Sequence, residues 1–171
     1  MPLSGTPLRS YSQSRSSPPE GDSHAGLPDG FDGPSIPDLL EDQMVSSIRW
    51  ISVDCADPFP LSRFYGDVTG WPTDADDRPG HDECAVLPPA PGHPGLLFTR
   101  VPEPKGAKNR LHLDLQPLDR TRDEEVERVI ALGATLLADR RGRGQGWIVL
   151  ADPEGNEFCM NTSPAEREQS A

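Results

Sequence analysis

The chain has 171 residues, of which 34% are hydrophobic, so it can hold one domain of ordinary size together with disordered tails. Its formal net charge of -12 argues against a nucleic-acid partner, because neutralising phosphates requires clustered Lys and Arg. Three cysteines are too few for a disulfide framework, and no apolar run is long enough for a membrane helix or a signal core. We therefore expect a soluble, cytoplasmic protein with reduced thiols and no membrane partner.

The two ends of the chain have the composition of unfolded segments. In residues 1–44, 20 of the 44 positions are Ser, Pro or Gly, and the segment carries two Arg against seven acidic residues. Such a segment cannot bury enough apolar surface to offset the entropy lost on ordering. We expect residues 1–44 to form a disordered acidic arm, residues 45–163 to fold, and residues 164–171 to form a short polar tail.

The folded part opens with a strand at 48–55, in which Ile51 and Val53 alternate with polar residues. A helix follows, with Asp57 as N-cap, Pro58 at its first position and Gly70 as its stop. The next 25 residues are rich in loop-forming residues. Three short strands are expected there and just beyond, at 71–74, 83–87 and 96–101.

The same order of elements then returns. A strand at 110–116 leads into Thr121 and Glu124, a capping box for a helix that Gly133 ends, with Val126, Val129 and Ile130 as its buried stripe. Three strands complete this half, at 134–138, 147–151 and 157–162. The last two form a hairpin around Asp152–Asn156, with Phe158 and Met160 on one face and polar residues on the other.

Matching intervals indicate an internal repeat. Asp57 follows Trp50 by seven positions, and Asp119 follows His112 by seven. Gly70 follows Asp57 by thirteen positions, and Gly133 follows Asp119 by fourteen. The spacing predicts two βαβββ modules, at about 45–104 and 105–163. Neither module can bury its sheet alone, so we expect them to pack around a shared interior.

Four motifs in this order resemble a known family. They are residues 54–58 followed by Phe64-Tyr65 and Gly70-Trp71, the run from Asn109 to Leu115, the run 131–134, and the closing hairpin 147–161. The chain resembles glyoxalase-like domains of the vicinal oxygen chelate (glyoxalase/bleomycin resistance/dioxygenase) superfamily, especially those common in bacterial proteins. The resemblance implies an α+β fold in which paired βαβββ modules form a curved, partly open mixed sheet with each helix on the convex side.

The resemblance also implies where a divalent metal would bind, through one residue from each of four strands. Those positions fall on Trp50, on His112, on Cys159, and near Leu97 or Phe98. Only His112 and Cys159 can ligate a metal, and this pair does not make the oxygen-rich site of the family. We therefore expect no metal or other cofactor. The alternative is a rescued site that uses Asp54, Asp114 or Glu157.

The residues expected to line a ligand cavity are Trp50, Asp54, His112, Asp114, Trp147, Glu157 and Cys159. His112 is the candidate catalytic group, as a general base, but it fits a structural role equally well. Cys159 is a nucleophile or soft ligand in one interpretation and inert packing in the other. Trp50 either stacks on a planar ligand or fills the volume of the absent metal.

Three functions remain open on the sequence. The leading hypothesis is a small-molecule-binding protein with a depleted metal site that sequesters or senses its ligand; the resemblance adds that such proteins pair as homodimers. The alternative is a metal-dependent lyase, isomerase or dioxygenase acting on a small oxygenated substrate. The third is an interaction module whose acidic arm carries the partner contacts. The sequence does not decide whether a reaction is catalysed.

Overall fold

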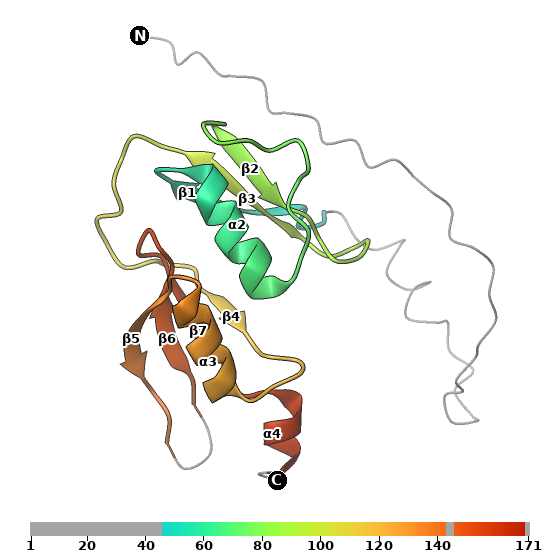
Figure 1. Ribbon diagram of the computed structural model, residues 1–171, viewed down its shortest axis with the longest axis vertical. Coiled ribbons are helices and arrows are strands. Elements are labelled where there is room, and N and C mark those ends of the chain that lie inside the picture. The colour runs from blue at the N-terminus through green and yellow to red at the C-terminus, as the bar shows by residue number, and fades with distance from the viewer. Residues whose placement is uncertain (1–45, 143–145, 170–171) are drawn as a thin grey trace, which may run out of the picture. The chain divides into compact units, whose positions relative to one another are not determined.

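A computed structural model describes residues 46–142 and 146–169, and the predicted arm at 1–44 lies outside these ranges. The first module contains strand β1 (Trp50–Cys55), helix α2 (Pro58–Thr69), and strands β2 (Glu83–Val86) and β3 (Gly95–Arg100). Figure 1 shows this module above the second one, with each module's helix in front of its strands. Every element predicted for this module is present, except that the expected strand at 71–74 is reduced to one isolated bridge between Thr73 and Val86.

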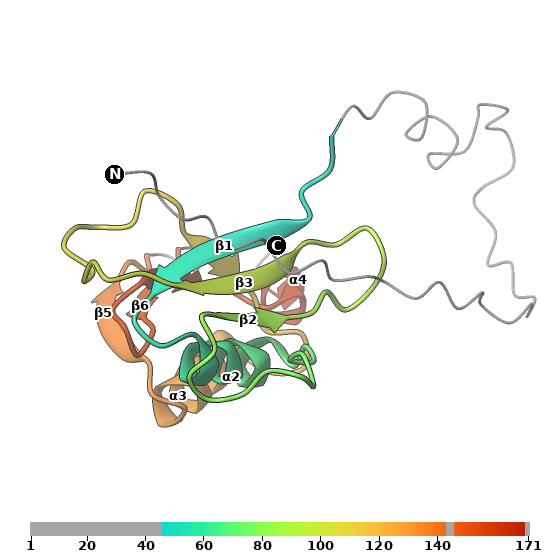
Figure 2. The same ribbon diagram turned by 90° about the horizontal axis from the view of Figure 1, so that it is seen from above.

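The second module repeats the arrangement with strand β4 (Leu113–Leu115), helix α3 (Arg122–Ala131), and strands β5 (Thr135–Asp139), β6 (Ile148–Ala151) and β7 (Glu157–Met160). The sheet orders are β1-β3-β2 and β4-β7-β6-β5, and in each sheet the first strand pairs in parallel with the last one. Two mixed sheets with their helices confirm the predicted α+β class. In Figure 2, α2 and α3 lie on the same side of the strands.

Local sequence explains the end of α2 and the start of α3. Gly70 closes α2 in the left-handed conformation, with φ of 70° and its N–H bonded to the Gly66 carbonyl at 2.8 Å. The predicted capping box of α3 is present: the Glu124 N–H donates to Thr121 Oγ1 at 3.3 Å, and the Thr121 N–H donates to Glu124 Oε2 at 2.9 Å.

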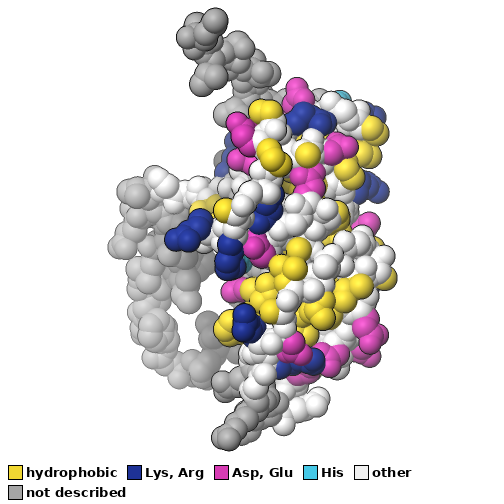
Figure 3. Space-filling view, turned by 90° about the vertical axis from the view of Figure 1, so that its left-hand side faces the viewer, with side chains coloured by type: hydrophobic (Ala, Val, Ile, Leu, Met, Phe, Trp, Pro, Cys, Tyr) yellow, Lys and Arg dark blue, Asp and Glu magenta, His cyan; other side chains and the backbone are white. Residues whose placement is uncertain are grey.

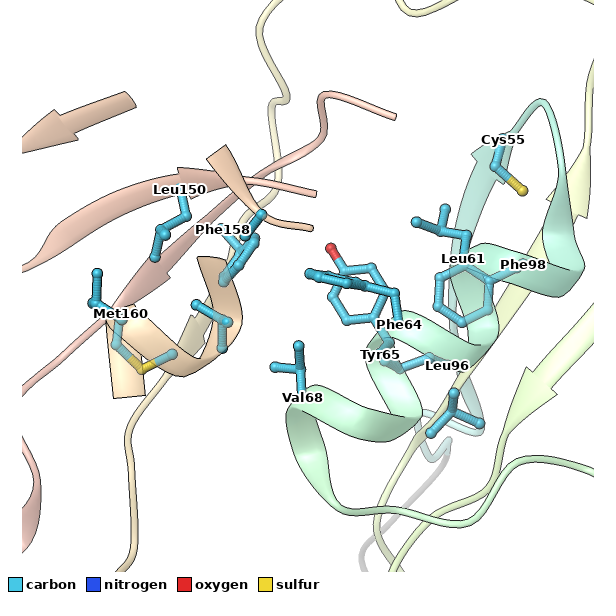
Figure 4. Close-up of a cluster of buried hydrophobic side chains, with 14 of the residues drawn as sticks. Cys55, Leu61, Phe64, Tyr65, Val68, Leu96, Phe98, Leu150, Phe158 and Met160 are labelled. Atoms are coloured by element: carbon cyan, nitrogen blue, oxygen red, sulfur yellow. The ribbon is translucent and has the colours of Figure 1, made fainter. Parts of the chain in front are cut away.

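One hydrophobic core joins the two modules, as predicted. Phe64 and Tyr65 on α2 contact Phe158 on β7, with ring centroids 6.3 and 6.2 Å apart. Figure 4 shows these side chains meeting between the modules, with Val68 and Met160 beside them. Phe158 and Met160 point into this core, which confirms the predicted faces of the closing hairpin. Because edge-to-face aromatic pairs add to area burial, this contact fixes one module against the other.

A buried ion pair forms a second joint between the modules. Arg128 on α3 bonds both oxygens of Glu125, at 2.8 and 2.6 Å, and Glu125 is only 6% exposed. The same guanidinium donates to the carbonyls of Asp67 and Val68, at 2.9 and 2.8 Å, near the end of α2. A cation at a helix C-terminus satisfies carbonyls that have no partner in the helix.

Three sequence predictions need correction. Strand β4 starts only at Leu113 and not at the predicted residue 110, and Leu111 is 70% exposed. Ile130 is 42% exposed, outside the stripe formed by Val126 and Val129. The supposed polar tail contains helix α4 (Pro164–Gln169). Its signal is a second capping box, in which the Ser163 N–H donates to Glu166 Oε2 at 2.9 Å.

Strand β5 is the outer strand of its sheet and carries exposed hydrophobic side chains. Leu136 and Leu137 are each 51% exposed, and Trp147 nearby is 46% exposed. In Figure 3, hydrophobic side chains gather on the side of the second module that carries this strand. No helix among the described residues is long and apolar enough to cross a membrane.

Candidate functional site

The closing hairpin turns around the buried carboxylate of Asp152. Asp152 Oδ1 accepts the N–H groups of Glu154 and Asn156, both at 2.9 Å, and its Oδ2 accepts the Asn156 amide at 3.0 Å and the Tyr65 hydroxyl at 3.1 Å. Burial raises the pKa of Asp152 in spite of these donors. Because Tyr65 belongs to α2, this carboxylate holds the hairpin against the first module.

Glu154, in the same turn, holds the backbone just before α2. Its two carboxylate oxygens accept the N–H groups of Ala56 and Asp57, at 2.6 and 2.8 Å, just before α2. The Asp57 side chain makes no capping hydrogen bond with the described residues. Its Oδ1 lies 3.4 Å from Nη2 of Arg100 instead. An acidic group at a helix start is favourable whichever element supplies it.

Glu157, the first residue of β7, fixes the connection between the modules, which comprises residues 101–112. Its Oε2 accepts the Asn109 N–H at 3.0 Å and lies 3.1 Å from the Lys105 ammonium. The Asn109 hydrogen bond, followed by Lys105, lowers the pKa of Glu157 to about 2. Glu157 therefore stays ionised at neutral pH, and its contacts position the residues that follow Asn109.

His112 lies just before β4, with its Nε2 atom 2.9 Å from Lys108 Nζ. An ammonium group can only donate, so Nε2 accepts and the ring proton sits on Nδ1. This contact and the Glu157–Asn109 bond bend the segment 108–112, which explains the late start of β4. His112 therefore presents an N–H donor to its surroundings, while its basic nitrogen is already engaged.

A cavity of about 280 Å³ lies between β1, the edge strand of the first sheet, and the segment leading into β4, the edge strand of the second. Polar groups from three elements line it: Ser52 and Asp54 from β1, Asn109, Arg110 and His112 from the connection, and Asn156 and Glu157 from the hairpin. The site is therefore assembled from both modules.

Three of the seven predicted site residues line this cavity: Asp54, His112 and Glu157. Asp114 and Cys159 are register partners on β4 and β7, outside the cavity lining. Burial, followed by hydrogen bonding to the Asp114 carboxylate, raises the pKa of the Cys159 thiol to about 11, which keeps it protonated at neutral pH. Cys159 is therefore a poor nucleophile.

The two predicted tryptophans also lie outside the lining of the cavity. Trp50 pairs in register with Gly95, and its ring lies so close to that glycine that a Cβ there would overlap it. Trp147 lies just before β6 and is 46% exposed.

Sequence reasoning missed Ser52, Asn109, Arg110 and Asn156 as cavity residues. Arg110 begins the segment predicted as a regular strand, and Asn109 immediately precedes it, so neither side chain was assigned to a site. A signal was present in the composition: residues 104–113 contain two Lys, one Arg and one His but no acidic residue, in a chain of net charge -12. Figure 3 shows Lys and Arg side chains gathered near the middle of the side along which this connection runs.

The four positions implied for a metal do not provide a suitable donor set. Leu97 pairs with Ser52 on the sheet face away from α2, whereas Phe98 is fully buried in the core, so the position near them offers only hydrocarbon. Trp50 offers no metal donor either, so only His112 and Cys159 carry donor atoms, and Nε2 of His112 lies 2.9 Å from the Lys108 ammonium. Within residues 46–142 and 146–169, no three His, Cys, Asp or Glu side chains are grouped as a metal site. These residues do not fit a divalent cation.

A second and larger hollow, of about 540 Å³, lies where the end of α2 meets the connection from β4 to α3. Its lining includes Val68, Trp71, Leu115, Leu118 and Met160 and contains none of the predicted site residues. Among its charged groups, Arg128 pairs with Glu125 and Arg120 pairs with Asp119. The smaller cavity contains three of the predicted site residues, so we take it as the candidate site.

Comparison with known proteins agrees with this architecture. The family model of the glyoxalase-like domain matches residues 50–161, so the chain belongs to the glyoxalase-like domain family. No curated protein matches the chain significantly.

Solved structures with this fold share little sequence with the chain. A glyoxalase/bleomycin resistance/dioxygenase family enzyme from Burkholderia phytofirmans has a TM-score of 0.53 and 22% identity, over 69% of this chain and 98% of that one. A variant of the fosfomycin resistance protein FosX from Listeria monocytogenes, in complex with Mn(II) and 1S,2S-dihydroxypropylphosphonic acid, has a TM-score of 0.55 and 21% identity over 72% and 95%. FosX from Mesorhizobium loti has a TM-score of 0.53 and 18% identity over 75% and 100%. Such distant likenesses establish the fold.

Proposed function

We propose that this protein binds a small polar molecule in the cavity between its modules, without a metal ion, and so sequesters or senses that molecule. The observation that carries the proposal is the cavity itself, into which three separate elements bring hydroxyl, amide, imidazole and charged groups. A concave site with a few convergent polar groups is the usual form of a small-molecule site. Its volume of about 280 Å³ is sufficient for a molecule of metabolite size.

The framework around the cavity is fixed by hydrogen bonds within the protein. Glu157 holds Asn109, and Asp152 holds the turn that carries Asn156. A site whose walls are already in place loses less conformational entropy when its ligand binds. This arrangement supports binding more directly than catalysis, because the basic nitrogen of His112 is engaged by Lys108.

The proposal can be tested with a broad metabolite and fragment library, screened against the full chain by thermal shift and by NMR. We expect hits whose resonance changes map to β1, the connection and the closing hairpin. Ser52→Phe should block these hits by filling the cavity from β1. Ser47→Phe is the matched control, because Ser47 is exposed and lies outside the lining. Hits that bind Ser52→Phe unchanged, or a library without hits, would refute the proposal.

The competing function is a metal-dependent lyase, isomerase or dioxygenase acting on a small oxygenated substrate. The observation in its favour is the fold shared with a FosX variant that holds Mn(II) and a phosphonic acid. In this chain such a site would have to recruit Asp54, Asp114 or Glu157, yet Glu157 is committed to Asn109 and Lys105. A calorimetric titration with Mn(II) separates the two functions. A protein that binds its ligand without metal should give no heat of specific Mn(II) binding, whereas a metal-dependent enzyme should.

We further propose a cytoplasmic homodimer. Proteins of this superfamily often form dimers, and the outer strand β5 supplies a suitable surface, because an edge strand can pair antiparallel with its own copy about a two-fold axis. The three buried cysteines are unpaired, as suits a reducing compartment. Light scattering after size exclusion should report a dimer that Leu137→Glu dissociates, whereas Leu118→Glu, at an 83% exposed position elsewhere, leaves it intact. A monomeric wild-type chain would refute the dimer.

A further inference from the structure

Two oppositely charged residues line the same cavity. Asp54 on β1 and Arg110 on the connection are both exposed, and neither side chain makes a hydrogen bond or an ion pair with any residue that the structure describes. They do not pair with each other either. Each is therefore available to a ligand that enters between β1 and the connection.

The other charged groups nearby are already engaged. Glu157 bonds Asn109 and Lys105, and Lys108 bonds His112. The hydrogen bond from the Asn109 N–H to Glu157 also holds the backbone immediately before Arg110. The backbone that carries the Arg110 side chain is therefore fixed at the cavity wall. Arg110 thus differs from the two lysines of the connection in having no partner among the described residues.

The chemistry of the two groups is complementary to two ends of one molecule. A guanidinium presents a planar set of donors that matches a carboxylate, often through two parallel hydrogen bonds. A carboxylate such as that of Asp54 in turn accepts hydrogen bonds from an ammonium group. The neutral groups between them, Ser52, Asn109 and Asn156, can bond uncharged polar atoms of the same ligand.

We infer that the ligand of this cavity is a small zwitterion of the amino-acid type, with its carboxylate on Arg110 and its ammonium on Asp54. The inference rests on the proposed binding function and adds the ligand class to it. The cavity volume of about 280 Å³ is sufficient for a single amino acid or a close derivative. The basic connection, in a chain of net charge -12, additionally attracts the carboxylate end.

The experiment is a titration of the full chain with the twenty common L-amino acids, followed by NMR. The best binder is then compared with its N-acetyl derivative, which lacks the cation, its carboxamide, which lacks the anion, and the doubly blocked form. We expect the free amino acid to bind about tenfold or more tightly than either singly blocked form, because each charge-assisted contact is lost separately.

Two variants assign the contacts. Arg110→Gln should weaken binding of the free amino acid and of its N-acetyl derivative about tenfold but leave binding of the carboxamide unchanged. Asp54→Asn should weaken binding of the free amino acid and of the carboxamide about tenfold but leave binding of the N-acetyl derivative unchanged. Both positions are exposed, so the fold should survive, and unchanged melting temperatures verify this. Arg63→Gln, an exposed position on α2 outside the cavity lining, is the matched control.

The outcomes separate this inference from the proposed function. If library compounds bind at the cavity and Ser52→Phe removes them, but no amino acid binds, the binding function stands and the zwitterion inference is overturned. The inference also fails if blocked and free amino acids bind equally well. If nothing binds the cavity in any arm, both the function and the ligand class are refuted.

Discussion

Glu157→Gln should release the connection between the modules. The pKa of Glu157 falls from its ordinary value of 4.5 to about 2, which at about 1.4 kcal/mol per pKa unit sets an upper bound of about 3 kcal/mol. The side chain is 13% exposed, so solvent screening reduces the expected loss to about 1–2 kcal/mol. Urea denaturation of both proteins at neutral pH measures this difference in the free energy of unfolding.

The pH dependence carries the stricter test. A carboxyl group whose pKa is lowered by folding stabilises the protein above its unfolded pKa, and this stabilisation is lost as the pH falls through the folded value. The difference between wild type and Glu157→Gln should therefore shrink between about pH 4.5 and 2. Glu103→Gln, in the same connection and exposed, should cost almost nothing. A constant difference across this range, or an equal cost for Glu103→Gln, would refute the reasoning.

Three more predictions follow from the described contacts. Tyr65→Phe should lower the free energy of unfolding by about 1–3 kcal/mol, measured by urea denaturation, because buried Asp152 loses a donor. Gly95→Ala should cost about 1–3 kcal/mol by overpacking against Trp50, and in a double-mutant cycle this cost should shrink in a Trp50→Ala background. Trp50→His combined with Cys159→Glu should create measurable divalent-metal binding in calorimetry, because the pair restores two family ligands beside the native imidazole.

Specific results would contradict each of these. A neutral Tyr65→Phe substitution would mean that water replaces the hydroxyl on Asp152. A cost of Gly95→Ala that is independent of Trp50 would assign the strain to the Val86 carbonyl, which lies 2.9 Å from the added Cβ. If the double replacement of Trp50 and Cys159 fails to bind metal while remaining folded, the missing donors are not what separates this chain from the metal-binding proteins of its superfamily.

The sequence predicted those features that depend on local signals. Hydrophobic alternation located β1 and β7, and the capping box at Thr121 located α3. The repeat predicted that neither module could bury its sheet alone, and the contact between Phe64 and Phe158 confirms the shared interior. These signals lie within a few residues of each other or recur at a fixed period, which is why one sequence suffices to detect them.

Features that depend on contacts between distant segments could not be predicted from the sequence. Glu154 bonds the backbone of Ala56 and Asp57, almost a hundred residues away, and no local pattern identifies that partner. The late start of β4 depends on Glu157 holding Asn109, again a contact between distant segments. Consequently Arg110 was assigned to a regular strand, whereas in the structure it precedes β4 and lines the cavity.

The most direct test of a metal-free site is the metal content of the full chain, purified without chelators and measured by elemental analysis. We predict well below one divalent ion per chain, because His112 bonds Lys108 and because Trp50 and Leu97 offer no donor atoms suited to a metal. A result near one ion per chain that is lost in His112→Ala would contradict the account and favour the metal-dependent enzyme.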